Sequence, residues 1–229
     1  MSNMRWCSDG FEFKRDSGET VTATFAKDCC DREILAWRAW EGKGLAGEPV
    51  RDMLVEAVER RFGTVEAVPL ERELEFLTDN GSAYIAHETR GIAKSLGLKP
   101  INTPVCSPQS NGMAESFVNT FKRDYMSCMD LRDAPTVLAQ LPGAFEHFNE
   151  IHSHSSLKMM SPREFRRQQS HPAHQGYLSD WTVSGTTGAR SASSLGAAAR
   201  LRGSLRTGSN YRFCVPSRLM STLSGSWLG

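Results

Sequence analysis

The order of the apolar patterns along the first 170 residues constrains the fold of this chain more than any other feature. Residues 5–41 predict three strands joined by short turns, because Val21, Ala23 and Phe25 alternate with threonines, as in a strand with one buried face. Strands joined by such short connections lie antiparallel to one another. The sequence therefore predicts an antiparallel meander near its start.

Helical and strand patterns alternate after this meander. The sequence predicts strands at 75–78 and 98–103, and helices at 49–62, 83–95, 113–128 and 134–149 with a short one after Ser161-Pro162. A strand–helix–strand connection places its two strands parallel in one sheet, with the helix on a face of that sheet. We therefore predict the α/β class, with a mixed sheet flanked by helices on both faces.

The composition changes abruptly near residue 170. Residues 171–229 hold 19 serines and glycines, six arginines, one aspartate and no lysine or glutamate, a net charge of +5. No helical or strand periodicity persists there, which predicts a disordered tail. The whole chain carries +1, so residues 1–170 carry −4. We predict one ordered domain over 1–169 and a low-complexity tail over 170–229.

The sequence excludes several classes of protein. Hydrophobic residues make up 39% of the chain, enough for a core, which excludes a wholly disordered protein. The chain has no run of 18 apolar residues and no pattern of a secretion signal, so we expect a cytoplasmic protein without a membrane partner. Its six cysteines form no C-x-x-C pair, which disfavours a zinc site, and we expect them to be buried and reduced.

Three acidic residues lie where a purely structural role is hard to assign. Asp9 lies inside the first strand, Asp79 follows an apolar strand, and Glu115 begins a helix after a Pro/Ser/Gly loop. Each also has an ordinary interpretation: an edge-strand aspartate, a turn residue, and a first-turn acid favoured by the helix dipole. Their joint pattern, with 35 residues between Asp79 and Glu115, favours a shared site.

The residues around these acids carry a family signature. Thr78-Asp79-Asn80-Gly81, followed by Ser107-Pro108-x-Ser110-Asn111-Gly112-x-x-Glu115, resembles the catalytic core of bacterial insertion-sequence transposases, in the retroviral-integrase-like or DDE superfamily. Residues 5–13 resemble the first-aspartate strand of that group, and residues 148–165 resemble its terminal signature. The resemblance covers residues 5–169 and implies a ribonuclease H-like fold.

The resemblance implies an enzyme of DNA transposition and integration, a polynucleotidyl transferase that cleaves DNA and transfers strands. Such displacements use two divalent ions, here Mg²⁺ with Mn²⁺ as a substitute, to activate the attacking oxygen and stabilise the leaving one. Hard cations prefer oxygen ligands, so Asp9, Asp79 and Glu115 are the expected catalytic residues and metal ligands, with Asp9 bridging the ions. Three carboxylates close together also predict perturbed pKa values where no metal is bound.

The resemblance also implies a surface that binds DNA, at transposon ends and at the target. Lys122 matches the basic residue expected two helical turns after Glu115, and Asn119 shares their helix face. The other residues expected to contact DNA are Arg123, Asn80, Ser110 and Asn111. Because residues 1–170 carry −4, attraction to DNA is expected to come from local basic clusters. These clusters are Arg60-Arg61, Lys122-Arg123, and Arg163 with Arg166-Arg167.

Two other functions stay open: a ribonuclease H-like nuclease, and a catalytically inactive transposon remnant. Lys122 and the terminal signature favour transposition over the first, and the presence of all three acids argues against the second. The chain starts just before its first catalytic strand, so we expect it to lack the helix-turn-helix of such proteins. We also expect residues 171–229 to be read through from unrelated DNA, and the enzyme to act as a homo-multimer that pairs two DNA ends.

Histidines are not expected to take part in the chemistry. His152 and His154 fall within the terminal signature, and a structural or supporting role is expected for His154. His87 is expected on the surface of its helix.

Overall fold

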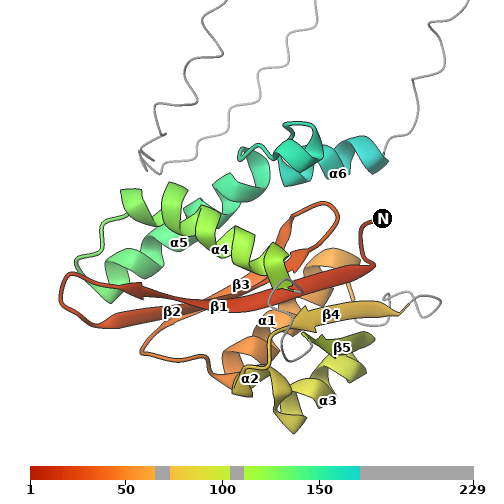
Figure 1. Ribbon diagram of the computed structural model, residues 1–229, viewed down its shortest axis with the longest axis horizontal. Coiled ribbons are helices and arrows are strands. Elements are labelled where there is room, and N and C mark those ends of the chain that lie inside the picture. The colour runs from red at the N-terminus through yellow and green to blue at the C-terminus, as the bar shows by residue number, and fades with distance from the viewer. Residues whose placement is uncertain (65–72, 104–110, 171–229) are drawn as a thin grey trace, which may run out of the picture.

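The computed structural model describes residues 1–64, 73–103 and 111–170 (Figure 1). Its strands are β1 (Arg5–Lys14), β2 (Thr20–Asp28), β3 (Ile34–Glu41), β4 (Leu74–Thr78) and β5 (Leu98–Asn102), which form one sheet in the order β3-β2-β1-β4-β5. The pairs β1–β2 and β2–β3 are antiparallel, and β1–β4 and β4–β5 are parallel. The prediction of a mixed sheet with a three-strand meander is confirmed. The predicted tail lies outside the described residues.

Helices cover both faces of this sheet. They are α1 (Gly47–Phe62), α2 (Ser82–Ile85), α3 (His87–Ser95), α4 (Gly112–Asp124), α5 (Ala134–Glu150) and α6 (Pro162–Ser170), with 3₁₀ turns at Met126–Cys128 and Ser155–Leu157. Helices α4 and α5 lie on one face, α1 to α3 lie on the other, and α6 packs against α5 (Figure 1). None of the helices in the described part of the chain is long and apolar enough to cross a membrane.

Two predicted helices differ from those observed. The helix expected over 83–95 is two helices, because Ala86 has an extended backbone (φ −52°, ψ 137°) that interrupts the helical hydrogen bonds. The helix expected over 113–128 ends at Asp124 and continues as a 3₁₀ turn. Cys128 therefore leaves the apolar face of α4 and is exposed, which contradicts its expected burial.

The cysteines form no disulfide among the described residues. Cys7 is buried, whereas Cys29 and Cys30 are half-buried, so the expectation of burial holds fully only for Cys7. Cys106 and Cys214 lie outside the described residues.

The core between the sheet and α4–α5 is rich in aromatic side chains. Phe117 and Phe121 of α4 pack inward as predicted, and Phe117 lies 4.3 Å, centroid to centroid, from Phe25 of β2. Phe11 of β1 contacts Phe121 at 5.6 Å. Each such pair adds about 0.5–1.5 kcal/mol to the stability that burial alone provides. This packing fixes α4 over the middle of the sheet, and with it every polar side chain that α4 carries.

Candidate active site

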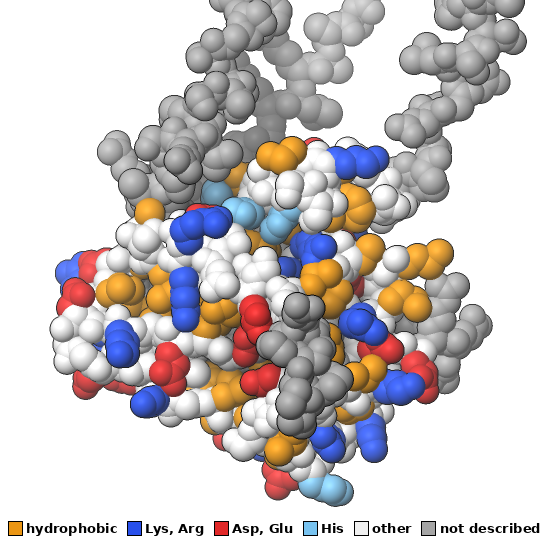
Figure 2. Space-filling model, viewed as in Figure 1, with side chains coloured by type: hydrophobic (Ala, Val, Ile, Leu, Met, Phe, Trp, Pro, Cys, Tyr) orange, Lys and Arg blue, Asp and Glu red, His pale blue; other side chains and the backbone are white. Residues whose placement is uncertain are grey.

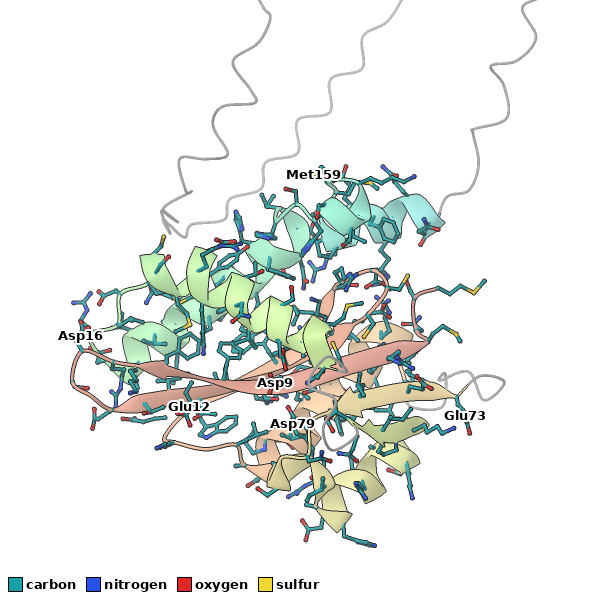
Figure 3. All side chains as sticks on the ribbon, viewed as in Figure 1. Asp9, Glu12, Asp16, Glu73, Asp79 and Met159 are labelled. Carbon is teal, nitrogen blue, oxygen red and sulfur yellow. The ribbon has the colours of Figure 1, made fainter. Side chains whose placement is uncertain are left out.

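Asp9 and Asp79 come together because their strands are parallel neighbours. The register pairs Cys7 of β1 with Leu77 of β4, and each aspartate lies two residues further along its strand. Asp9 lies two residues from Cys7 and two from Phe11, so all three side chains lie on the face of β1 that α4 covers. Figure 3 shows Asp9 and Asp79 near each other below the start of α4, where Asp79 influences the pKa of Asp9.

The turn after β4 holds Asp79 in place. Its Oδ1 accepts a hydrogen bond from the Gly81 backbone N–H at 2.9 Å, and its carbonyl accepts one from Asn102 Nδ2 at 2.8 Å. Asn80 Nδ2 donates to the Thr103 carbonyl at 3.0 Å. A β-carbon added at Gly81 would lie 2.9 Å from Asp79 Oδ1, so only glycine fits here without moving the carboxylate.

Glu115 reaches the same place from the first turn of α4. Ala114, Phe117 and Val118 are buried against the sheet, which leaves Glu115 exposed. Asn111, just before the helix, is buried, and its Nδ2 donates to the Ser8 carbonyl at 3.3 Å. This bond ties the start of α4 to β1 one residue before Asp9, and so sets Glu115 beside the two aspartates.

The electrostatics of the three acids match this arrangement. The pKa of Asp9 is raised to about 6, mainly by burial and in part by the nearby charges of Asp79 and Glu115, whereas the Gly10 N–H and Lys122 oppose the shift. The Asp9 Oδ1 accepts that Gly10 N–H at 2.7 Å. The expected pKa perturbation is therefore confirmed for Asp9.

The donor set fits a hard divalent cation, because it consists of carboxylate oxygens alone. Across residues 1–64, 73–103 and 111–170, however, no three His, Cys, Asp or Glu side chains stand close enough to hold a metal ion. Asp9 and Asp79 each accept a hydrogen bond from a neighbouring backbone N–H, that of Gly10 and that of Gly81.

A buried hydroxyl cluster supports Asp9 from the other face of the sheet. Tyr84 of α2 shares hydrogen bonds with Ser8 (2.7 Å) and Thr24 (3.0 Å), and the Thr24 hydroxyl donates to the Asp9 carbonyl at 3.2 Å. Burial raises the pKa of Tyr84, so its hydroxyl stays protonated. This cluster could not be predicted from the sequence, because the position of Tyr84 in its helix equally suits an ordinary core residue.

Comparisons with known proteins agree with this geometry. Two models, each described as "Integrase core domain", match residues 1–108 and 96–162. The putative transposase InsD for insertion element IS2E of Escherichia coli (strain K12) is 55% identical over 170 residues, which cover 74% of this chain and 76% of that protein. This chain belongs to the integrase-core transposase family. The predicted family resemblance is confirmed.

Further relatives of this integrase-core transposase extend the comparison. The Escherichia coli transposase InsD for insertion element IS2A/D/F/H/I/K is also 55% identical over 170 residues, and the chain spans about half (55%) of its length. In structure, the chain is similar to the catalytic core domain of BIV integrase (TM-score 0.51, 18% identity, 74% of this chain and 97% of that one). It also resembles a chain of a simian T-cell lymphotropic virus intasome complex (TM-score 0.57, 19% identity, 82% and 61%). These structures show an integrase-core fold, and enzymes of this family generally depend on divalent metal ions.

The residues that this transposase was expected to use for DNA contact lie in different surroundings. Lys122 and Asn119 are exposed on α4, and Asn80 is exposed after β4. Arg123 is exposed but pairs with Asp124, at 2.6 and 2.7 Å. The buried Asn111 positions α4 rather than presenting a free side chain, and Ser110 lies outside the described residues.

The other basic clusters belong mainly to the fold. Arg61 is buried and pairs with Asp28 (3.3 Å), Asp31 and Glu33 (2.7 Å), so the expectation that Arg61 attracts DNA is wrong. Arg163 and Arg166 of α6 pair with Glu33 at 3.0 and 2.8 Å. These arginines therefore form salt bridges within the fold. Lys122, which lies near the three acids, forms no salt bridge with any described residue.

The terminal signature is structural in the places that the structure describes. Both amide atoms of Asn149 bond to the backbone of Ile34, where Oδ1 accepts its N–H at 2.8 Å and Nδ2 donates to its carbonyl at 2.9 Å. His152 stacks on Phe148, and His154 meets Phe148 edge-on. Burial lowers the pKa of His154 to about 3, so the ring is neutral. His87 is exposed, as expected.

Proposed function

We propose that residues 1–169 are the catalytic domain of an insertion-element transposase that cleaves DNA and transfers strands. The observation that carries this proposal is that Asp79, after β4, and Glu115, at the start of α4, both act on the pKa of Asp9 in β1, so the three acids are neighbours. The 55% identity to the InsD proteins supports the same activity. Residues 170–229 are proposed to be a separate, low-complexity segment.

In this proposal Asp9, Asp79 and Glu115 hold two Mg²⁺ ions. When bound, such ions polarise the phosphate oxygens and lower the pKa of an attacking hydroxyl. The protein contributes position: the Gly81 N–H orients Asp79, and the Ser8–Thr24–Tyr84 cluster fixes the backbone of Asp9.

DNA contact is proposed for the exposed polar groups that surround the acids. Lys122 lies seven residues after Glu115 on α4, which places their backbones about 10 Å apart along the helix axis. A strand whose scissile phosphate lies at the acids therefore brings a neighbouring phosphate to Lys122. Asn119 and Asn80 flank the same surface, and Arg123 joins it when its pair with Asp124 opens. Multimers are proposed because strand transfer joins separate DNA ends.

A strand-transfer and nicking assay on a pre-cut DNA end tests this function. We expect Mg²⁺- or Mn²⁺-dependent joining by the wild type, and loss of about 10³-fold or more in Asp79→Asn and Glu115→Gln, since each removes charge stabilisation at the reacting phosphate. Asp16→Asn is the matched control, because Asp16 is exposed in the turn at the far end of β1 (Figure 3). Activity that survives both site variants overturns the assignment, and nicking without joining indicates the nuclease instead.

A further inference from the structure

A cavity of about 530 Å³ lies on the side of α4 away from the three acids. It is bounded by the first three turns of α4, the end of β2 with the turn that follows, and the end of α5 with residues 152–156 after it. Figure 2 shows histidine side chains gathered between α4 and α6, in this part of the surface. The proposed chemistry does not use the residues that line it.

Lys27 forms the floor of this cavity and has no charged partner. It continues the inward face of β2 after Ala23 and Phe25, and only 4% of its surface is exposed. Its Nζ lies 5.4 Å from the Phe117 ring centroid and 5.9 Å from that of Phe148. Within the described residues, its ammonium group makes no ion pair or hydrogen bond. Arg32 and the thiols of Cys7 and Cys29 also lie near it. A buried cation in such surroundings is costly unless an anion joins it.

Two further groups turn unsatisfied nitrogen atoms toward the same place. Arg32 forms no ion pair with any described carboxylate, and its buried Nε lacks a hydrogen-bond partner. Its backbone has a positive φ of 67°, which directs the side chain back over the cavity wall, where Nη1 contacts Met113 Sδ. The Nε2 of His154 is buried and also unpartnered. Such orphaned groups are rare in proteins and indicate a missing partner.

The start of α4 adds partial positive charge. Gly112, its first residue, lines the cavity, and no described side chain caps the helix: Asn111 Nδ2 donates to the Ser8 carbonyl, and its Oδ1 accepts no hydrogen bond. Ser116 and Thr120 contribute hydroxyls from the next two turns. No aspartate or glutamate lines the cavity among the described residues. Every charged or partly charged group there therefore favours an anion.

We propose that this cavity binds a phosphate group, held by Lys27, Arg32, His154 and the N-terminus of α4. Glu115 immediately precedes Ser116 on α4, so the cavity adjoins the catalytic acids across one helix. We take the phosphate to be one in the backbone of the DNA strand that runs over α4. This choice of source rests on the proposed function, whereas binding of phosphate as such does not.

Calorimetric titration of the full chain with inorganic phosphate tests the binding itself. It is done without metal in the Asp79→Asn background, so that catalysis cannot affect the result. We expect saturable one-site binding that weakens about tenfold or more in Lys27→Met, since a charge-assisted hydrogen bond contributes that much. Lys14→Met, which removes an exposed lysine at the end of β1, is expected to bind like its parent. Equal affinity in Lys27→Met and its parent overturns the site.

Arg32→Asn provides a second variant, because asparagine tolerates the positive φ at this position. We expect it to weaken phosphate binding while the circular dichroism spectrum stays that of the parent. If Lys27→Met does not fold, unchanged affinity in Arg32→Asn overturns the proposal on its own.

The source of the phosphate is tested with a thymidine dinucleotide and its uncharged methylphosphonate analogue. Binding of the first but not the second, lost in Lys27→Met, supports a DNA backbone phosphate. Binding of inorganic phosphate without the dinucleotide overturns the DNA source and leaves a site for free phosphate. If phosphate binds but the wild type shows no strand transfer, only the proposed function is refuted. If strand transfer occurs but phosphate does not bind, only the proposed phosphate site is refuted.

Discussion

Lys27 and Asp28 are consecutive residues of β2, both are buried, and their surroundings are opposite. Asp28 faces α1, where Arg61 pairs with it at 3.3 Å and the backbone N–H groups of Asn3 and Cys30 donate to it. Lys27 faces α4, near aromatic rings, Arg32 and the thiols of Cys7 and Cys29, and it forms no ion pair with any described carboxylate. A buried charge with a full set of partners, such as Asp28, stabilises the fold, whereas one without partners, such as Lys27, indicates a binding site.

The largest change in stability is expected when Arg61, the cation that pairs with Asp28, is removed. We expect Arg61→Met to lower the free energy of unfolding by about 3–5 kcal/mol, because it leaves Asp28, Asp31 and Glu33 buried without their cation. Urea denaturation measures this change. Arg60→Met is the control, since Arg60 is mostly exposed and its one ion pair within the described residues is with Glu56. A loss below about 1 kcal/mol for Arg61→Met would contradict the view that this cluster holds the fold together.

Removing Lys27 should act in the opposite direction. Burial lowers the pKa of Lys27 from 10.5 to about 8, so between these pH values the unfolded chain binds more protons than the folded one. The stability of the wild type should therefore rise with pH across this window, by up to about 3 kcal/mol. Lys27→Met should be more stable than the wild type at pH 7.

The readout is the difference between the two unfolding curves as a function of pH. Cys7 and Cys29 lie near Lys27 and have perturbed pKa values of their own, but the difference cancels contributions common to both proteins. Parallel curves from pH 7 to 10.5 would show that Lys27 is not a desolvated cation in solution.

Asp9 is also a partly buried charge that forms no salt bridge with any described residue, so its removal is expected to stabilise the metal-free protein, though less than removal of Lys27. Asp9→Asn should raise the unfolding free energy of the metal-free protein by about 1 kcal/mol, because it removes a partly buried charge beside Asp79 and Glu115. The same change should abolish strand transfer. Thermal unfolding measured with and without Mg²⁺ checks both parts: the ion should stabilise the wild type and not Asp9→Asn. A variant less stable than the wild type without metal would argue against mutual repulsion.

The smallest effect on stability is expected at Gly81. Gly81→Ala should change the unfolding free energy by less than about 1 kcal/mol, yet lower strand transfer about tenfold or more, because its β-carbon displaces Asp79 Oδ1. Gly91→Ala in α3 is the matched control, since nothing lies within 4 Å of its added carbon. Normal activity in a folded Gly81→Ala protein would show that Asp79 is free to move.

The sequence predicted the features that depend on local pattern. Alternation at Val21, Ala23 and Phe25 defined the meander, and the family signature led to Asp9, Asp79 and Glu115. The parallel pairing of β1 with β4 brings the two aspartates together, and the packing of α4 on the sheet adds Glu115. The break at Ala86 was missed, because the helical pattern continues across it. Its cause is tertiary: Tyr84 turns toward Ser8 and Thr24 on the sheet.

The partners of buried charges could not be predicted from the sequence. Arg61 in α1 has the sequence neighbours of a surface arginine, and only the packing of α1 against β2 and the turn after it brings three carboxylates to it. Lys27 carried a signal, since it extends the buried face of β2 by one more alternation. The groups that surround Lys27 come from α4, from Phe148 of α5 and from residues 152–156, all far away in the sequence.

Asn149 has a consequence for how copies of this chain can meet. β3 is an edge of the sheet, and an edge strand with free backbone groups invites pairing with a strand of another molecule. The amide of Asn149 takes both backbone groups of Ile34 and so mimics the peptide of a neighbouring strand. The start of β3 is thereby closed to sheet extension, so a strand of another copy could pair only with the later part of this edge.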